Sequence, residues 1–152
     1  MAPQWQTGIL EVLDGAQDMT VATLRDDGFP QATTVSFVHR GLMIYFGCGR
    51  DSQKARNLKH SDKVSVTVNL PYRDWNEIRG LSLGGHAQPV MDPGETRHVL
   101  DAMYEKFPQI RNYADTADDE ELCLVRVEPA IISLLDYRKG FGHTERFRVH
   151  PE

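Results

Sequence analysis

The chain has 152 residues, of which 40% are hydrophobic and 26% charged, a composition typical of globular rather than disordered proteins. This length fits a single domain over residues 1–152 and can bury a core without a metal or a disulfide. The net charge of −5 argues against general nucleic-acid binding, and no apolar run is long enough to cross a membrane. The N-terminus lacks the features of a signal peptide, and the two cysteines, Cys48 and Cys123, are expected to be ordinary reduced thiols. We therefore expect a cytoplasmic protein.

Alternation of apolar and polar residues predicts a mainly β protein. The predicted strands are residues 19–25, 31–38, 42–46, 63–69, 79–91, 122–127 and 131–137. Tight turns at residues 26–28 and 39–41 would join the first three strands into an antiparallel meander. Pro129 is expected to break the chain between the last two strands.

Two of these strands carry finer information. In the strand of residues 63–69, the side chains of Val64, Val66 and Val68 lie on one face. We expect this face to point into the interior of the barrel. Three glycines within residues 79–91 predict sharp bending or a bulge, as at the corner of a barrel.

Three short helices are predicted, at residues 8–14, 52–60 and 92–107. The third begins with Asp92 as its cap, then a proline and the acidic Glu95, which is a capping-box pattern. Six or seven strands with short flanking helices indicate a small β-barrel of the α+β type.

The segment from residue 44 to residue 58, IYFGCGRDSQKARNL, is the richest in candidate chemistry. It reads as a strand, a glycine-rich turn and a helix whose first turn carries Ser52, Gln53 and Lys54. Unpaired amides at a helix start attract phosphate, while Lys54 would add a full charge and Ser52 a hydroxyl donor. The same pattern also fits a capped surface helix with solvated lysines.

A dinucleotide-binding Rossmann fold is a poor alternative for this turn, although Gly47, Gly49 and Ser52 nearly match its glycine motif. Serine replaces the third glycine, the helix is short, and no acidic residue for a ribose ends the next strand. The preceding strands are also joined by hairpins rather than by crossovers. We therefore do not predict a Rossmann fold.

A second candidate feature is the face formed by Ala32, Thr34 and Ser36. These small, mostly hydroxyl-bearing side chains would let a flat heterocycle approach the backbone, although small residues also fit the taper of a barrel. The six histidines show no metal-ligand spacing, and no nucleophile elbow or Walker loop occurs. A bound cofactor is therefore the expected carrier of any chemistry.

The order of these segments resembles the pyridoxamine 5′-phosphate oxidase-like family of FMN-binding split β-barrels. The segments that carry the resemblance are ATLRDDGFPQATTVSFV, LMIYFGCGRDSQKARNL, DKVSVTVNL and IRGLSLGGHAQPV. The sharpest motif is S-x-K-x-x-N-L, from Ser52 to Leu58. The resemblance implies a mainly β, six-stranded antiparallel split β-barrel with short flanking helices, usually a homodimer with the cofactor at the subunit interface.

By position, the resemblance implies that nine residues bind the cofactor. The FMN phosphate would contact Ser52, Gln53 and Lys54; the ring would run along Thr34, Val35 and Ser36; the ribityl chain would lie beside Phe46 and Gly47; and Trp75 would come from the second subunit. Many relatives have arginine at the position of Gln53, so the phosphate charge would come from Lys54 with Arg50 or Arg56. No catalytic side chain and no metal are expected.

The function implied is that of an oxidoreductase that passes electrons from a reduced nicotinamide to a small organic acceptor. The alternatives are a deazaflavin-dependent reductase and a barrel that holds haem or flavin without turnover, with His39 and His86 as the histidines considered for haem. Arg148 and His150 have the Arg-x-His spacing of the family's vitamin B6 oxidases. Because terminal residues often fray, we do not predict vitamin B6 oxidation.

Overall fold

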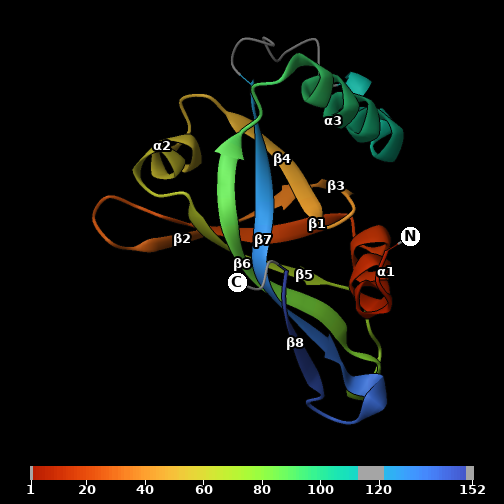
Figure 1. Cartoon of the computed structure of the whole chain (residues 1–152). Helices are drawn as coiled ribbons and strands as arrows, with labels where there is room; N and C mark the ends of the chain where they lie inside the picture. Colours follow the sequence, from red (N-terminus) through yellow and green to blue (C-terminus); the bar gives the residue numbers. More distant parts are fainter. Residues whose placement is uncertain (1, 113–121, 150–152) are drawn as a thin grey trace.

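The computed structural model describes residues 2–112 and 122–149, which form a curled antiparallel sheet flanked by short helices (Figure 1). The α-helices are α1 (Thr7–Gly15), α2 (Gln53–His60) and α3 (Pro93–Lys106). The strands are β1 (Asp18–Leu24), β2 (Pro30–Ser36), β3 (Val38–Arg40), β4 (Met43–Gly49), β5 (Lys63–Asn69), β6 (Arg79–Pro89), β7 (Leu122–Asp136) and β8 (Thr144–Arg148). The predicted mainly β, α+β split barrel is confirmed, although the described residues divide into eight strands rather than six.

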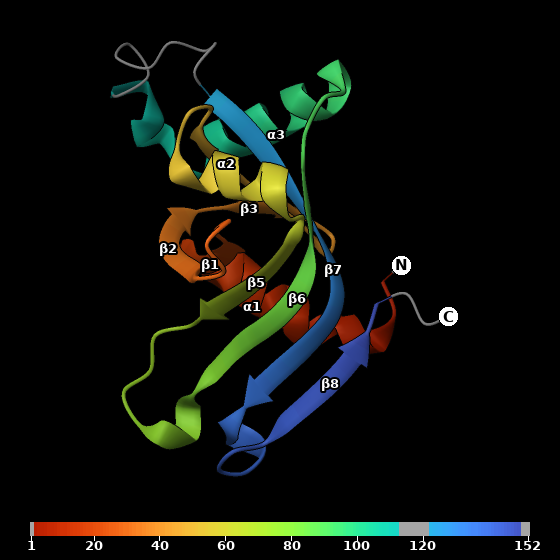
Figure 2. The same cartoon turned by 90° about the vertical axis from the view of Figure 1, so that its left-hand side faces the viewer.

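The strand order is β2-β1-β5-β6-β7-β4-β3, and β8 pairs with β7 off this path. β6 pairs with β7 along nearly its whole length, and Figure 2 shows the two as long, strongly curved ribbons. The other edge of β7 is shared, because residues 122–127 pair with β4 and residues 131–135 pair with β8. This division of β7 between two partners opens the barrel into two halves.

The predicted meander of the first three strands is wrong. The hairpins β1–β2 and β3–β4 both form, but β2 and β3 stand at opposite ends of the strand order. Phe37, between them, is fully buried, and its neighbour Val38 is buried as well. Two consecutive buried residues break the period of two, so the chain leaves one edge of the sheet at Phe37 and continues on the other.

The predicted break at Pro129 is also wrong, because β7 runs continuously through it. The register of β6 against β7 shifts at this point: Gly84 pairs with Ile131 and Gly85 with Pro129, which leaves Ala130 as an extra residue. A Cβ atom on Gly85 would lie 2.6 Å from the carbonyl oxygen of Glu128. The bulge predicted from the glycines is thus confirmed, and it accommodates the proline within a paired strand.

β8 was not predicted, and it places Arg148 in a paired strand rather than in a frayed end. Arg146 and Arg148 are exposed, whereas Phe147 between them stacks on Trp5 with ring centroids 5.1 Å apart. His150 lies outside the described residues.

The interior of the barrel contains the predicted valines of β5, with Val66 and Val68 fully buried and Val64 only 6% exposed. α1 closes one side of this core. A second, smaller cluster joins α3 to β3, β4 and β7 through Val38, Tyr45, Val99, Phe107 and Leu124. The predicted cap of α3 is confirmed, because the Asp92 carboxylate accepts a hydrogen bond from the amide of Glu95 at 2.8 Å. No helix within residues 2–112 and 122–149 is long and apolar enough to span a membrane.

Candidate functional site

The turn before α2 is built to leave two backbone amides free. The Ser52 hydroxyl donates to the carbonyl oxygen of Gly49 at 2.7 Å and accepts from the amide of Ala55 at 3.2 Å, so it caps the helix. The amides of Gln53 and Lys54 are the first of the helix and have no carbonyl one turn earlier. Together with the positive end of the helix dipole, they favour an anion at this point.

Lys54 is half-buried and makes no hydrogen bond or ion pair with any described residue. The neighbouring Arg56 is already engaged, since its guanidinium donates to the carbonyl oxygen of Asp51 at 3.2 Å and to Oε1 of Gln53 at 2.8 Å. Lys54 is therefore the ammonium group of this helix start that remains available to a ligand.

Asn57 fixes α2 against the β1–β2 hairpin, a role that the sequence reasoning missed. Its side chain is 1% exposed and donates to Oγ1 of Thr23 at 2.9 Å and to Oε1 of Gln31 at 3.1 Å. Its own Oδ1 accepts a hydrogen bond from the side-chain Nε2 of Gln53 at 2.7 Å, so the backbone amide of Gln53 stays free. Gln53 is thus held between Asn57 and Arg56, and it positions the turn from within the helix. The signal available in the sequence was an asparagine inside a short helix, where it has low propensity.

The two exposed residues predicted on β2 lie on the outer face of the sheet. Thr34 and Ser36 point to solvent, whereas Val35 packs against the barrel core. In register with Thr34, a row of hydroxyl-bearing residues crosses the face through Thr20, Thr67, Ser82 and Ser133. β2 is also the end strand of the sheet, so part of its backbone has no strand partner within the described part of the chain.

Phe46 and Gly47 lie on β4, just before the turn. The Phe46 side chain is fully buried in the barrel core, so it is not available to a ligand outside the core. A Cβ on Gly47 would lie 3.2 Å from the end of the Leu122 side chain, a close contact that a shift of this leucine could relieve.

Trp75 lies far from α2 in the same chain. It belongs to the short 3-10 helix η2 (Trp75–Glu77) that joins β5 to β6, at the bottom of Figure 2, whereas α2 is at the top. The seven residues of β5 separate the two ends by on the order of 20 Å. The indole is 64% exposed, and its nearest ring is that of Phe141, with centroids 6.0 Å apart. The structure therefore brings Ser52, Gln53 and Lys54 together but leaves Trp75 apart from them.

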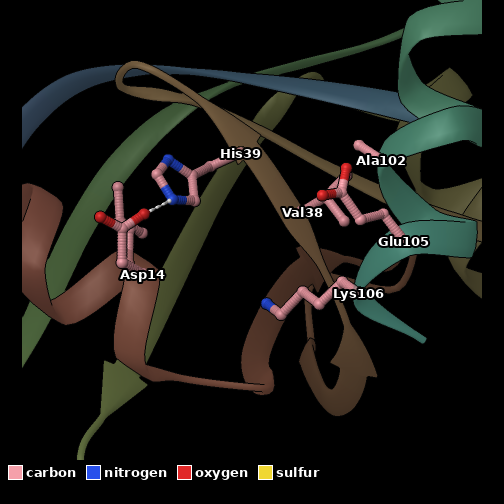
Figure 3. A pocket seen from close by; sticks show the side chains of 7 residues that line it. Asp14, Val38, His39, Ala102, Glu105 and Lys106 are labelled. Atoms are coloured by element: carbon pink, nitrogen blue, oxygen red, sulfur yellow. Dashed lines mark hydrogen bonds and ion pairs between the residues drawn. The ribbon is translucent and has the colours of Figure 1, made fainter.

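A pocket of about 320 Å³ opens elsewhere, between α1, β3 and α3 (Figure 3). None of the nine predicted cofactor residues lines it. His39 is held there between Asp14, at 2.7 Å from Nε2, and the carbonyl oxygen of Gly41, at 2.9 Å from Nδ1. Lys106 donates to the carbonyl oxygen of Phe37 at 2.8 Å, and burial lowers the pKa of this lysine. The hydrogen bonds of His39 tie α1 to β3, and that of Lys106 ties α3 to the residue before β3.

Within the described ranges, no three or more His, Cys, Asp or Glu residues are placed to hold a metal ion. His86, on the outer face of β6, has Nδ1 at 3.0 Å from the Asp62 carboxylate.

The comparisons with known proteins agree with this architecture. The sequence model of the pyridoxamine 5′-phosphate oxidase family matches residues 7–135. The chain therefore belongs to this family, as the resemblance of its segments had indicated.

Three relatives illustrate the range of similar proteins. The chain is 22% identical over 128 residues to general stress protein 26 of Bacillus subtilis (strain 168), covering 84% of this chain and 86% of that protein. A haem-binding protein from Mycobacterium smegmatis shares the fold with a TM-score of 0.81 at 17% identity; the match covers 97% of this chain but only 59% of that one. The haem storage protein HutZ from Vibrio cholerae matches with a TM-score of 0.67 at 20% identity, covering 85% of this chain and 91% of that one.

Proposed function

We propose that the protein binds FMN and acts as an oxidoreductase between a reduced nicotinamide and a small organic acceptor. The observation that carries the proposal is the start of α2, whose first two residues carry two free amides and the unpaired side chain of Lys54. This donor set suits a phosphate monoester, which offers several acceptor oxygens and nearly two negative charges.

The rest of the flavin would lie along β2 and the neighbouring outer face. Thr34, Ser36 and the hydroxyl row beside them offer a flat surface of small donors and acceptors, and the edge backbone of β2 can bond the rim of a heterocycle. When bound, flavin supplies hydride and electron transfer, so the chain itself needs only to bind, orient and shield the ring.

A homodimer completes this proposal. Trp75 is too distant to contact the turn at α2 in its own chain, so it can reach a flavin only across an interface with a second copy. Exposed aromatic side chains near Trp75 support such an interface, because Phe141 is 76% and Tyr72 is 52% exposed.

The absorption spectrum of the purified protein, before and after addition of FMN, tests the cofactor. Bands of bound oxidised flavin support the proposal, and their loss on anaerobic addition of a reduced nicotinamide would support the reaction. A colourless protein that takes up no FMN would contradict it and direct attention to a deazaflavin.

Haem is a second candidate ligand, favoured by the two similar structures named for haem and by the geometry of His86. An imidazole whose Nδ1 is held by a carboxylate leaves Nε2 free to ligate iron, and Asp62 holds His86 in this way. By contrast, both nitrogens of His39 face oxygen atoms. A Soret band that appears on haem titration of the wild type, but not of His86→Ala, would support this candidate over FMN.

A further inference from the structure

Cys48 and Cys123 lie directly opposite each other on neighbouring strands. Cys48 on β4 is the register partner of Cys123 on β7, and both side chains face the barrel core. Directly opposed residues of an antiparallel pair have Cα atoms about 4.5–5.5 Å apart, which falls within the range that a disulfide spans. Both are free cysteines in the structure.

We propose that these two cysteines form a reversible disulfide, a redox modification site at the end of β4 that immediately precedes the turn carrying Ser52 and Lys54. The bond would join β4 to β7 at their last pairs, next to the start of α2. The two thiols are opposed whichever cofactor the turn binds.

The exposure of the two thiols sets the order of the reaction. Cys123 is half-buried, whereas Cys48 is 8% exposed, so a small oxidant reaches Cys123 first. With oxidised glutathione as oxidant, the Cys123 thiolate attacks one glutathione sulfur and releases one glutathione thiol. The Cys48 thiolate then attacks the Cys123 sulfur of the mixed disulfide and releases the second glutathione. Overall, the protein thiols lose two electrons and two protons, which the glutathione disulfide gains.

The surroundings of Cys48 affect the rate at which its thiolate attacks the mixed disulfide on Cys123. Burial and the adjacent Cys123 raise the pKa of the Cys48 thiol, while the Ser52 hydroxyl and the charge of Lys54 oppose this rise. Because the thiolate is the attacking species, closure of the disulfide should be slow near neutral pH and faster as the pH rises.

The test is oxidation of the folded protein in a glutathione redox buffer, followed by blocking of free thiols and mass spectrometry without reductant. We expect the intact chain to lose two hydrogen atoms and both titratable thiols. Trypsin should yield the peptides 41–50 and 112–126 covalently joined, because these are bounded by Arg40, Arg50, Arg111 and Arg126. Dithiothreitol should restore both thiols.

Two controls make the result decisive. Cys48→Ser keeps the accessible Cys123 thiol and should stop at the mixed disulfide with glutathione. The wild type in urea should contain at least about tenfold less of the joined species at the same buffer composition, since the strand register no longer holds the thiols together. A folded wild type that keeps both thiols, or that stops at the mixed disulfide as Cys48→Ser does, would overturn the proposal. So would equal populations of the joined species in urea and in native buffer.

Discussion

Lys54 is the side chain expected to contribute most to the binding of the FMN phosphate. Lys54→Ala should weaken FMN binding by roughly 1.5–3 kcal/mol, because it removes a charge-assisted bond to the phosphate. Riboflavin, which lacks the phosphate, should lose little affinity. Titration of the apoprotein with both ligands measures the difference.

Lys59 provides the matched control for Lys54, because it lies on the same helix and is exposed. Lys59→Ala should leave both affinities nearly unchanged. If Lys54→Ala weakens FMN and riboflavin equally, Lys54 does not contact the phosphate.

Asp136 makes the stability of the protein depend on pH. Its buried carboxylate accepts hydrogen bonds from Nε and the terminal nitrogen of Arg138, both at 2.8 Å, and this partner lowers its pKa to about 2 from 3.8. Since the folded state binds this proton more weakly than the unfolded state, the contribution is present above about pH 4 and is lost as the pH falls towards about 2.

Asp136→Asn should therefore lower the free energy of unfolding by about 2 kcal/mol at about pH 6, and by less than about 1 kcal/mol at about pH 2.5. Urea unfolding of wild type and variant at both pH values measures this. Asp26→Asn, in the exposed β1–β2 turn, should change stability little at either pH. A loss for Asp136→Asn that is the same at both pH values would show that the carboxylate charge is not what stabilises the site.

The bulge between β6 and β7 contains two adjacent glycines, Gly84 and Gly85, that are expected to respond differently to substitution by alanine. Gly85→Ala should lower the free energy of unfolding by about 1–3 kcal/mol, because its Cβ would meet backbone of Glu128 and Pro129 at 2.6 and 3.1 Å. At Gly84 the nearest atom is a methyl group of Ile131, at 3.6 Å, an ordinary contact. Gly84→Ala should thus be neutral or slightly stabilising. Equal effects of the two substitutions in denaturant unfolding would contradict this description of the bulge.

The sequence predicted the individual strands better than their pairing. The period of two in β5 and the cap at Asp92 are local signals, and both are confirmed. The path at Phe37 and the continuity through Pro129 depend on which strand lies alongside, and no local pattern contains that information. β8 did have a local signal, the alternation of Arg146, Phe147 and Arg148, but its proximity to the terminus suggested fraying.

In the candidate site, too, the features set by neighbouring residues were predicted, whereas those set by contacts between distant segments were not. Ser52 and Lys54 are close in sequence, and the helix that Ser52 was expected to begin does start there, with Lys54 in its first turn. The asparagine inside the short helix marked Asn57 as unusual, but its role as an anchor depends on Thr23 and Gln31, which come from strands distant in sequence. Likewise, the opposed cysteines become visible only once β4 and β7 are paired.

A flavin site to which Trp75 contributes requires two copies of the chain, because Trp75 lies far from α2 in its own chain. Trp75→Ala should weaken both dimerisation and FMN binding while leaving the barrel folded, because the indole is mostly exposed. Light scattering during a flavin titration measures the two properties together. Tyr104→Ala, a less exposed aromatic on α3, serves as a control away from η2. A wild type that stays monomeric while it binds one FMN per chain would exclude a site shared between subunits.

Recognition of the FMN phosphate at the start of α2 can be measured without any variant. The wild-type apoprotein is titrated with FMN and with riboflavin, and binding is followed by the quenching of flavin fluorescence. We predict that FMN binds at least about tenfold more tightly than riboflavin, corresponding to about 1.4 kcal/mol from the phosphate. Equal affinities for the two flavins, or no binding of either, would contradict the claim.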